Sequence, residues 1–388
     1  MCPVPSHAHT SPDDGGGRDV RVRRLLSAVL LPLIVATLVG FVWMWPGAAD
    51  VEVPKGFSSE RARGTVLEVP PCGPTDICTA EVRLTSGVGS PGEVAVLIPV
   101  GAGAPTIEVG DELVLIHTPE APPGQQYQFF DYDRSTTLLV LVAIFVLAVL
   151  ALTRWRGLAS LVALGISVLV VVQFVLPALL AGSTPVLVAV VGAGVIMIAT
   201  LYLTHGFTTR TSVALLGTLL SLGLTGVLGA IFTGVTKFTG QADESNVFLS
   251  VLLSDLDVRG LLLAGLVIGA LGVLDDVTVT QAAAVWELAH AQPSATRRSL
   301  FAAAMRIGRS HVQATVNTLV LAYVGASLPL LLIFTVTDVG LVDALTTEVI
   351  ATEILRGLVG SIGIIAAVPL TTAVAAVAVR PRSAGPDP

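Results

Sequence analysis

Two adjacent aspartates are the side chains best placed to carry chemistry inside a membrane. The apolar run that starts at Gly260 reaches only 15 residues before it meets Asp275 and Asp276. At about 1.5 Å of rise per residue, such a helix extends about 22 Å, which is short of a hydrocarbon core of about 30 Å. We therefore expect both carboxylates to lie at membrane depth, where they could hold a proton or a cation.

Polar residues that follow the pair could complete such a site. Oxygen atoms are the ligands that hard cations prefer, and hydroxyl and amide oxygens occur at Thr278, Thr280 and Gln281. A break in the helix at the carboxylates would add free backbone oxygens, as in transporters with discontinuous helices. Asn317 lies in a later apolar run, so its amide is expected to bond between helices or to line a path.

The same residues also allow a structural interpretation. In it the membrane span ends at Asp275 and Asp276, and the pair caps an interfacial helix from Val277 to His290 on the cytoplasmic surface. The sequence leaves both interpretations open and does not identify a metal.

The composition indicates a chain that lies mostly in lipid. Hydrophobic residues make up 53% and charged residues only 13% of its 388 positions. Apolar stretches long enough to cross a bilayer predict a polytopic α-helical membrane protein with about eight spans. They lie at 25–45, 137–153, 158–180, 184–204, 212–234, 260–276, 312–335 and 352–378.

Arginines predict the orientation of these spans. Four of them precede the first apolar run, which resembles a signal peptide but is too long and has no cleavage site, so we expect a retained anchor at 25–45. Threading the chain from an inside N-terminus puts most of the basic residues on the inside, as the positive-inside rule requires. The sequence therefore predicts the inner membrane of a bacterium, a cytoplasmic disordered tail at 1–24, a membrane domain at 137–378 and a cytoplasmic tail at 379–388.

Residues 50–135 form the one large segment outside the apolar runs. Short alternating stretches predict five strands at 61–69, 79–85, 93–100, 112–118 and 127–131, packed as a small OB-like β-barrel on the outer side of the membrane. The segment is acidic and has few aromatic residues, so nucleic acid is not expected as a partner. Cys72 and Cys78 lie close enough in sequence to form a disulfide, although two free thiols remain an alternative.

No motif for an enzyme or a cofactor is present. The sequence contains no HExxH, Walker, GxSxG or Cys-His metal pattern, and no nucleophile stands with a base. We therefore expect neither enzymatic activity nor a cofactor.

Ordered blocks in the second half of the chain resemble the YibE/F family. They include Ile268 to Gln281 with its Asp-Asp pair, Trp286-Glu-Leu, Ile307-Gly-Arg-Ser-His, Asn317 to Gly325, Glu353 to Gly363 and Val368-Pro-Leu-Thr371. The resemblance covers roughly residues 137–378 and implies a bacterial multi-pass membrane protein, without an activity that can be carried over. Family members have an Asp followed by a small or hydrophobic residue where this chain has Asp275-Asp276, so the two are considered together.

Two functions agree with these features. The first is a secondary transporter or permease for a cation or a cation-coupled solute, with Asp275 and Asp276 as its ion or proton site and Thr278, Thr280, Gln281 and Asn317 as nearby ligands. The second is a non-transporting envelope scaffold whose outer β domain binds a periplasmic or cell-wall partner. In either case the expected partners are membrane lipids and a second copy of the chain or another membrane protein.

Overall fold

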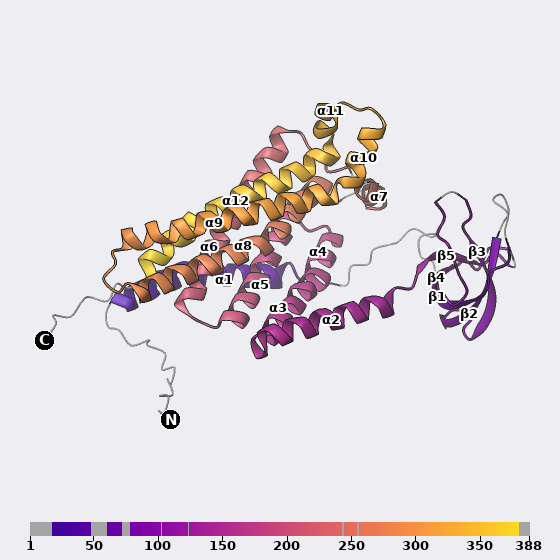
Figure 1. Cartoon of the computed structure of the whole chain (residues 1–388), viewed down its shortest axis with the longest axis horizontal. Coiled ribbons are helices and arrows are strands. Elements are labelled where there is room, and N and C mark those ends of the chain that lie inside the picture. The colour runs from indigo at the N-terminus through magenta and orange to yellow at the C-terminus, as the bar shows by residue number, and fades with distance from the viewer. Residues whose placement is uncertain are drawn as a thin grey trace, which may run out of the picture. The chain divides into compact units, whose positions relative to one another are not determined.

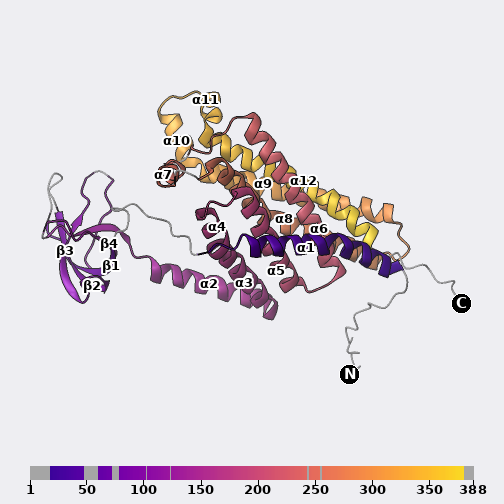
Figure 2. The same ribbon diagram turned by 180° about the vertical axis from the view of Figure 1, so that it is seen from behind.

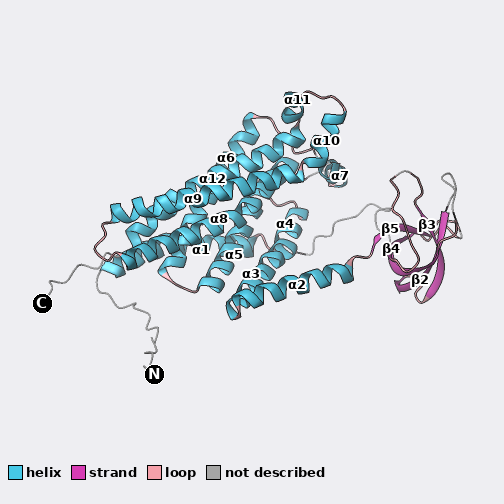
Figure 3. Ribbon diagram, viewed as in Figure 1, coloured by secondary structure: helices cyan, strands magenta, loops and turns pink. Residues whose placement is uncertain are grey.

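The computed structural model describes residues 18–47, 60–71, 78–101, 103–122, 124–242, 244–253 and 256–379. The chain divides into two compact units, one of residues 51–158 and one of residues 1–50 with 159–388. Figure 3 shows that the described strands all belong to the first of these units and that the second is helical. The predicted tail at 1–24 falls partly outside the described residues, and helix α1 (Arg18–Trp43) already includes its last seven residues.

The five predicted strands are present, each within two residues of its expected bounds. They are β1 (Glu60–Glu68), β2 (Cys78–Gly87), β3 (Gly92–Ile98), β4 (Glu112–His117) and β5 (Tyr127–Tyr132). They close a barrel in the order β1-β2-β3-β5-β4, in which β1 pairs with β2 and β4, and β3 runs parallel to β5. Alternate residues point inward, so that Val66, Val82, Val96, Leu113 and Leu115 form a buried apolar core.

Cys78 begins β2 with only 2% of its surface exposed, and it is disulfide-bonded. Its predicted partner, Cys72, lies outside the described residues, so the pairing stays a prediction.

Peptide mapping without reductant tests that pairing. We expect one cross-linked peptide that contains Cys72 and Cys78, and a free-energy loss of about 2 kcal/mol in the Cys72→Ser variant because the open loop has more conformational freedom when unfolded. Alkylation of both thiols in the unreduced protein would contradict the pairing.

Helix α2 (Ser135–Thr153) follows the barrel in the same unit, and none of its residues is buried. Its first turn is fixed by Asp133, whose Oδ1 accepts a hydrogen bond of 3.0 Å from the Ser135 amide. Hydrogen bonds from the side chain and backbone of Ser135 hold the pKa of the Asp133 carboxyl below its usual value. The carboxylate therefore stabilises the start of this apolar helix.

The other unit is a bundle of helices. Besides α1 it contains α3 (Trp155–Val170) from residue 159 on, a π-helical turn (Val171–Val175), α4 (Leu176–Leu180), α5 (Pro185–His205), α6 (Thr209–Val235), α7 (Glu244–Leu252), α8 (Val258–Ala291), α9 (Arg297–Ala326), α10 (Leu328–Val336), α11 (Leu341–Thr346) and α12 (Glu348–Ala378). Helices α8 and α12 pack on each other and on both α6 and α9. Helix α5 packs on α8, and α1 lies beside α5 (Figures 1 and 2).

Among the described residues, seven helices are long and apolar enough to cross a membrane, and an eighth span results if α9 and α10 count together. These two helices meet at an angle of 55°. Pro329 lies at the start of α10, where it cannot donate a backbone hydrogen bond to the preceding turn, which explains the bend. The protein is therefore a polytopic helical membrane protein.

The predicted break at the aspartate pair is absent. Helix α8 runs uninterrupted over 34 residues, so Asp275 and Asp276 neither interrupt it nor cap a separate helix at Val277. The hydroxyl of Thr278 donates to the Asp275 carbonyl oxygen at 3.1 Å, and that of Thr280 donates to the Asp276 carbonyl oxygen at 2.7 Å. Both hydroxyls thus bond to carbonyl oxygens of their own helix, and the helix continues past them.

Small residues let α6 and α12 approach closely. A Cβ atom added at Gly217 would overlap Thr371, and one added at Gly363 would overlap Thr225. Gly217 contacts Thr371, and Thr225 contacts Gly363. Residue numbers therefore rise along α6 where they fall along α12, so the two helices are antiparallel. Contacts of this kind stabilise helices in lipid, where no hydrophobic effect holds them together.

Enlarging Gly217 should therefore weaken the bundle. We expect Gly217→Leu to lower the free energy of unfolding in detergent by about 1–3 kcal/mol, because the added atoms overlap Thr371. Gly223→Leu, on the same helix but with open space around it, should stay within about 0.5 kcal/mol of the parent. Equal effects of the two substitutions, measured by circular dichroism, would rule out close packing at Gly217.

Candidate functional site

The aspartate pair lies at the middle of α8, with 17 residues before Asp275 and 15 after Asp276. A helix of this length extends about 51 Å, longer than a hydrocarbon core of about 30 Å, and the pair lies about 25 Å from either end. The Asp275 side chain points toward the protein, and its Oδ1 atom is buried without a hydrogen-bond partner among the described residues. The Asp276 side chain is 68% exposed.

Helix α9 brings a histidine to this pair. The Nε2 atom of His311 lies 3.8 Å from Oδ2 of Asp276, within ion-pair range but too far for a hydrogen bond. Carboxyl and imidazole groups are the side chains that form proton relays inside membrane proteins. Sequence spacing did not reveal His311 as a partner, because its position depends on the antiparallel register of α8 and α9.

Two of the predicted ligands, Thr278 and Gln281, instead form hydrogen bonds between helices. Thr278 is fully buried, and its hydroxyl lies 2.6 Å from that of Thr218 on α6. The amide of Gln281 donates to the Ala304 carbonyl oxygen at 3.0 Å and to the Thr372 hydroxyl at 2.7 Å, which connects α8 with α9 and α12. These bonds satisfy polar groups in the bundle interior and hold α8 in register with its neighbours.

The site lies within a region shared with other proteins. The sequence profile of YibE/F-like proteins matches residues 141–381, which include α5 to α12. The chain belongs to the YibE/F-like family. No curated protein matches the chain. The resemblance expected from the motifs of the second half is thus confirmed, and the aspartate pair and His311 both fall inside the family region.

Asn317 and Thr280 lie on the surface of this YibE/F-like chain. Both side chains are exposed, and Asn317 makes no hydrogen bond to either aspartate among the described residues. An amide exposed at membrane depth requires a partner from lipid headgroups, water or a second protein. Asn317 is therefore not brought together with the pair within the single chain.

A second polar group, on α12, lies against the first half of α8 in the family region. Glu353 and Arg356 form an ion pair on α12, with 2.6 Å between Oε1 and Nη1. The guanidinium extends toward Gly265, and the Tyr323 hydroxyl lies against Gly269. Because the glycines have no side chains, polar groups from α9 and α12 reach the α8 backbone there.

Three glycines and Asp276 share one face of α8. Gly265, Gly269, Gly272 and Asp276 are spaced by four, three and four residues, and all four are exposed. Nothing lies within 4 Å of a Cβ atom built on Gly272. We call this face of α8, formed by Gly265, Gly269, Gly272 and Asp276, the α8 seam. Arg356, Tyr323 and the aspartate pair thus lie at successive positions along it. Among the described residues, no three His, Cys, Asp or Glu side chains are spaced to hold a metal ion together.

The bond between Thr218 and Thr278 can be measured by a double-mutant cycle. We expect Thr218→Val and Thr278→Val to show a coupling free energy of about 0.6 kcal/mol, typical of hydrogen bonds between membrane helices. The cycle uses unfolding in detergent micelles. Thr225→Val and Thr278→Val are the control pair, since among the described residues the Thr225 hydroxyl bonds only to its own helix. Additive effects in the first cycle would show that the two hydroxyls do not interact.

Proposed function

We propose that this protein is a secondary transporter or permease that moves a cation, or a solute coupled to one, and that a proton is the cation its central site fits best. The observation that carries the proposal is the meeting of Asp275, Asp276 and His311 at the middle of a continuous membrane-spanning helix. Ionisable groups at such a depth are costly, so they persist where they serve an ion or proton pathway.

The surroundings of the pair support a pathway on the α8 seam. Asp276 is exposed on the face that carries Gly265, Gly269 and Gly272, while the Asp275 carboxyl turns inward. Glu353 and Arg356 provide charged groups toward the other end of the same seam. A proton could therefore pass between groups that differ in their access to the surroundings, with His311 as the neighbouring acceptor.

We propose a topology of eight membrane spans, with both termini in the cytoplasm of a bacterium. Counting α9 and α10 as one span gives an even number, and the antiparallel pairing of α6 with α12 agrees with their order in this count. Arginines at the ends of the spans favour the orientation predicted from the sequence.

The barrel is proposed to be OB-like and to lie outside the cytoplasm, as a lid or docking module. The strand order β1-β2-β3-β5-β4, with a parallel pairing of β3 and β5, supports this assignment. A disulfide-bonded Cys78 agrees with an oxidising compartment.

Transient currents from purified protein in liposomes test the transport proposal. On a capacitive sensor, jumps of H⁺, Na⁺, K⁺, Mg²⁺, Mn²⁺ and Zn²⁺ concentration should produce a current for H⁺ that the Asp275→Asn and Asp276→Asn double variant lacks. His311→Gln should reduce the current by about tenfold or more, because it removes one member of the relay. Glu287→Gln, an exposed carboxyl on the same helix, is the matched control and should keep the current.

Silence across the panel from well-folded protein would contradict transport. It would favour the scaffold function, in which the barrel binds a periplasmic or cell-wall partner. Deletion of residues 50–135 then separates the two functions, since it should abolish binding by a scaffold and leave the proton current of a transporter.

A further inference from the structure

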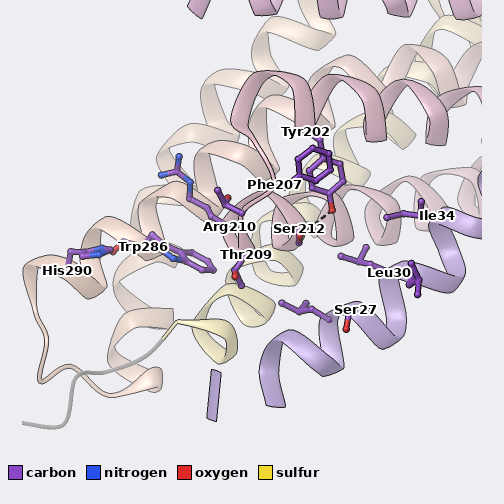
Figure 4. Close-up of a pocket in the computed structure, with 13 residues that line it drawn as sticks. Ser27, Leu30, Ile34, Tyr202, Phe207, Thr209, Arg210, Ser212, Trp286 and His290 are labelled. Carbon is purple, nitrogen blue, oxygen red and sulfur yellow. Dashed lines mark hydrogen bonds between the residues drawn. The ribbon is translucent and has the colours of Figure 1, made fainter. Parts of the chain in front are cut away.

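A large cavity lies at the end of the bundle opposite to Glu353, where α1 and α6 begin and α5 and α8 end. Its volume is about 720 Å³. Figure 4 shows Ser27, Leu30 and Ile34 of α1 along one side of it and Arg210, Trp286 and His290 along the other. The cavity thus has an apolar wall and a wall with cationic and polar groups.

The polar wall has hydrogen-bonding capacity left for a ligand. None of the ion pairs between described residues involves Arg210. His290 uses Nδ1 for the Trp286 carbonyl oxygen at 2.8 Å, which leaves Nε2 free of that bond. Thr209 and its hydroxyl also line the cavity. An anion would find a guanidinium, an imidazole and a hydroxyl donor there.

A second cavity of about 490 Å³ shares three residues with the first, Ile34, Tyr202 and Phe207. Its remaining wall is made of Ile166, Ile198, Ala199 and Leu203, all apolar. Because Ile198 lies seven residues before the end of α5, the second cavity reaches about 10 Å along α5 from that end. The combined space therefore has a polar end near the helix termini and an apolar end at greater depth.

Such a space matches a lipid more closely than a water-soluble anion. The apolar side chains beside the opening, Leu31 and Phe207, are 62% and 88% exposed, so the opening faces hydrocarbon. We propose that it binds an anionic glycerophospholipid, whose phosphate lies at Arg210 and His290 and one of whose acyl chains occupies the cavity lined by Ile34 and Ile198. Basic pockets between membrane helices on the cytoplasmic side recognise lipid headgroups in this way.

The fluorescence of Trp286 reports the occupant directly, because its indole lines the cavity. The chain has four tryptophans, and Trp43, Trp45 and Trp155 are replaced by Phe so that Trp286 remains alone. The variant is placed in phosphatidylcholine nanodiscs, to which phosphatidylglycerol or phosphatidylcholine with brominated acyl chains is added. We expect saturable quenching by the brominated anionic lipid at about fivefold lower mole fraction than by the zwitterionic one, as one or two cationic contacts would give.

Three variants separate the parts of the proposal. Arg210→Gln with His290→Gln should bring the two quenching curves together, since the phosphate loses its cationic partners. Ile198→Phe fills the apolar cavity and should shift both curves to higher mole fraction while the preference for the anionic lipid persists. Arg306→Gln, an exposed arginine on α9 that does not line the cavity, is the control and should change neither curve.

Equal quenching by the two lipids in the parent protein would overturn the proposal. So would a preference that survives Arg210→Gln with His290→Gln in protein whose circular dichroism is unchanged. Soluble glycerol phosphate is added as a competitor, and relief of quenching by it would identify a site for a free phosphate-bearing anion in place of a lipid. No effect of this competitor is the result expected for a lipid held by both its headgroup and its chain.

Discussion

The arrangement of the membrane unit depends on one constraint, which is that polar groups inside lipid must find partners within the protein. Helix α8 meets this constraint in two ways. Thr278 and Gln281 bond to α6, α9 and α12, which places α8 at the centre of the bundle. The carboxyl of Asp275, in contrast, has an oxygen without a hydrogen-bond partner among the described residues. Because the Asp275 carboxyl lacks this partner while Thr278 and Gln281 have theirs, we expect the mobile proton at Asp275.

Glycine and threonine determine how closely the helices approach this centre. Gly217 and Gly363 admit the side chains of Thr371 and Thr225, while Gly308 leaves room for Gln281. At Gly308 the close approach also lets the Gln281 amide bond to α9 and α12, so packing and polar satisfaction depend on the same position there. On another face of α8, Arg356 of α12 and Tyr323 of α9 reach Gly265 and Gly269. Nothing lies within 4 Å of a Cβ atom built on Gly272, so the part of the seam next to Asp276 remains open. The asymmetry distinguishes the structural face of α8 from the proposed functional face.

Local sequence patterns predicted most of the helices and strands, but they did not predict contacts between segments that are distant in the sequence. The five strands followed from alternation and turn residues, and the spans followed from apolar length. The break at Asp275 was wrong because the sequence shows polar side chains but not their bonds, and Thr278 and Thr280 donate to carbonyl oxygens of their own helix. His311 was not recognised as a partner of Asp276 because no sequence period gives the register of α9 against α8. The pairing of Glu353 with Arg356 was predictable because both lie on one helix.

The central claim is that the group around Asp275 and Asp276 takes up and releases a proton at membrane depth, and infrared difference spectroscopy in lipid bilayers tests it most directly. Between acidic and alkaline pH, the account predicts a carbonyl stretching band of a protonated carboxyl that appears in the parent protein. The band should be lost in the Asp275→Asn and Asp276→Asn double variant and kept in Glu287→Gln. A spectrum in which the double variant retains the whole band would contradict the account, because the titrating carboxyls would then lie elsewhere.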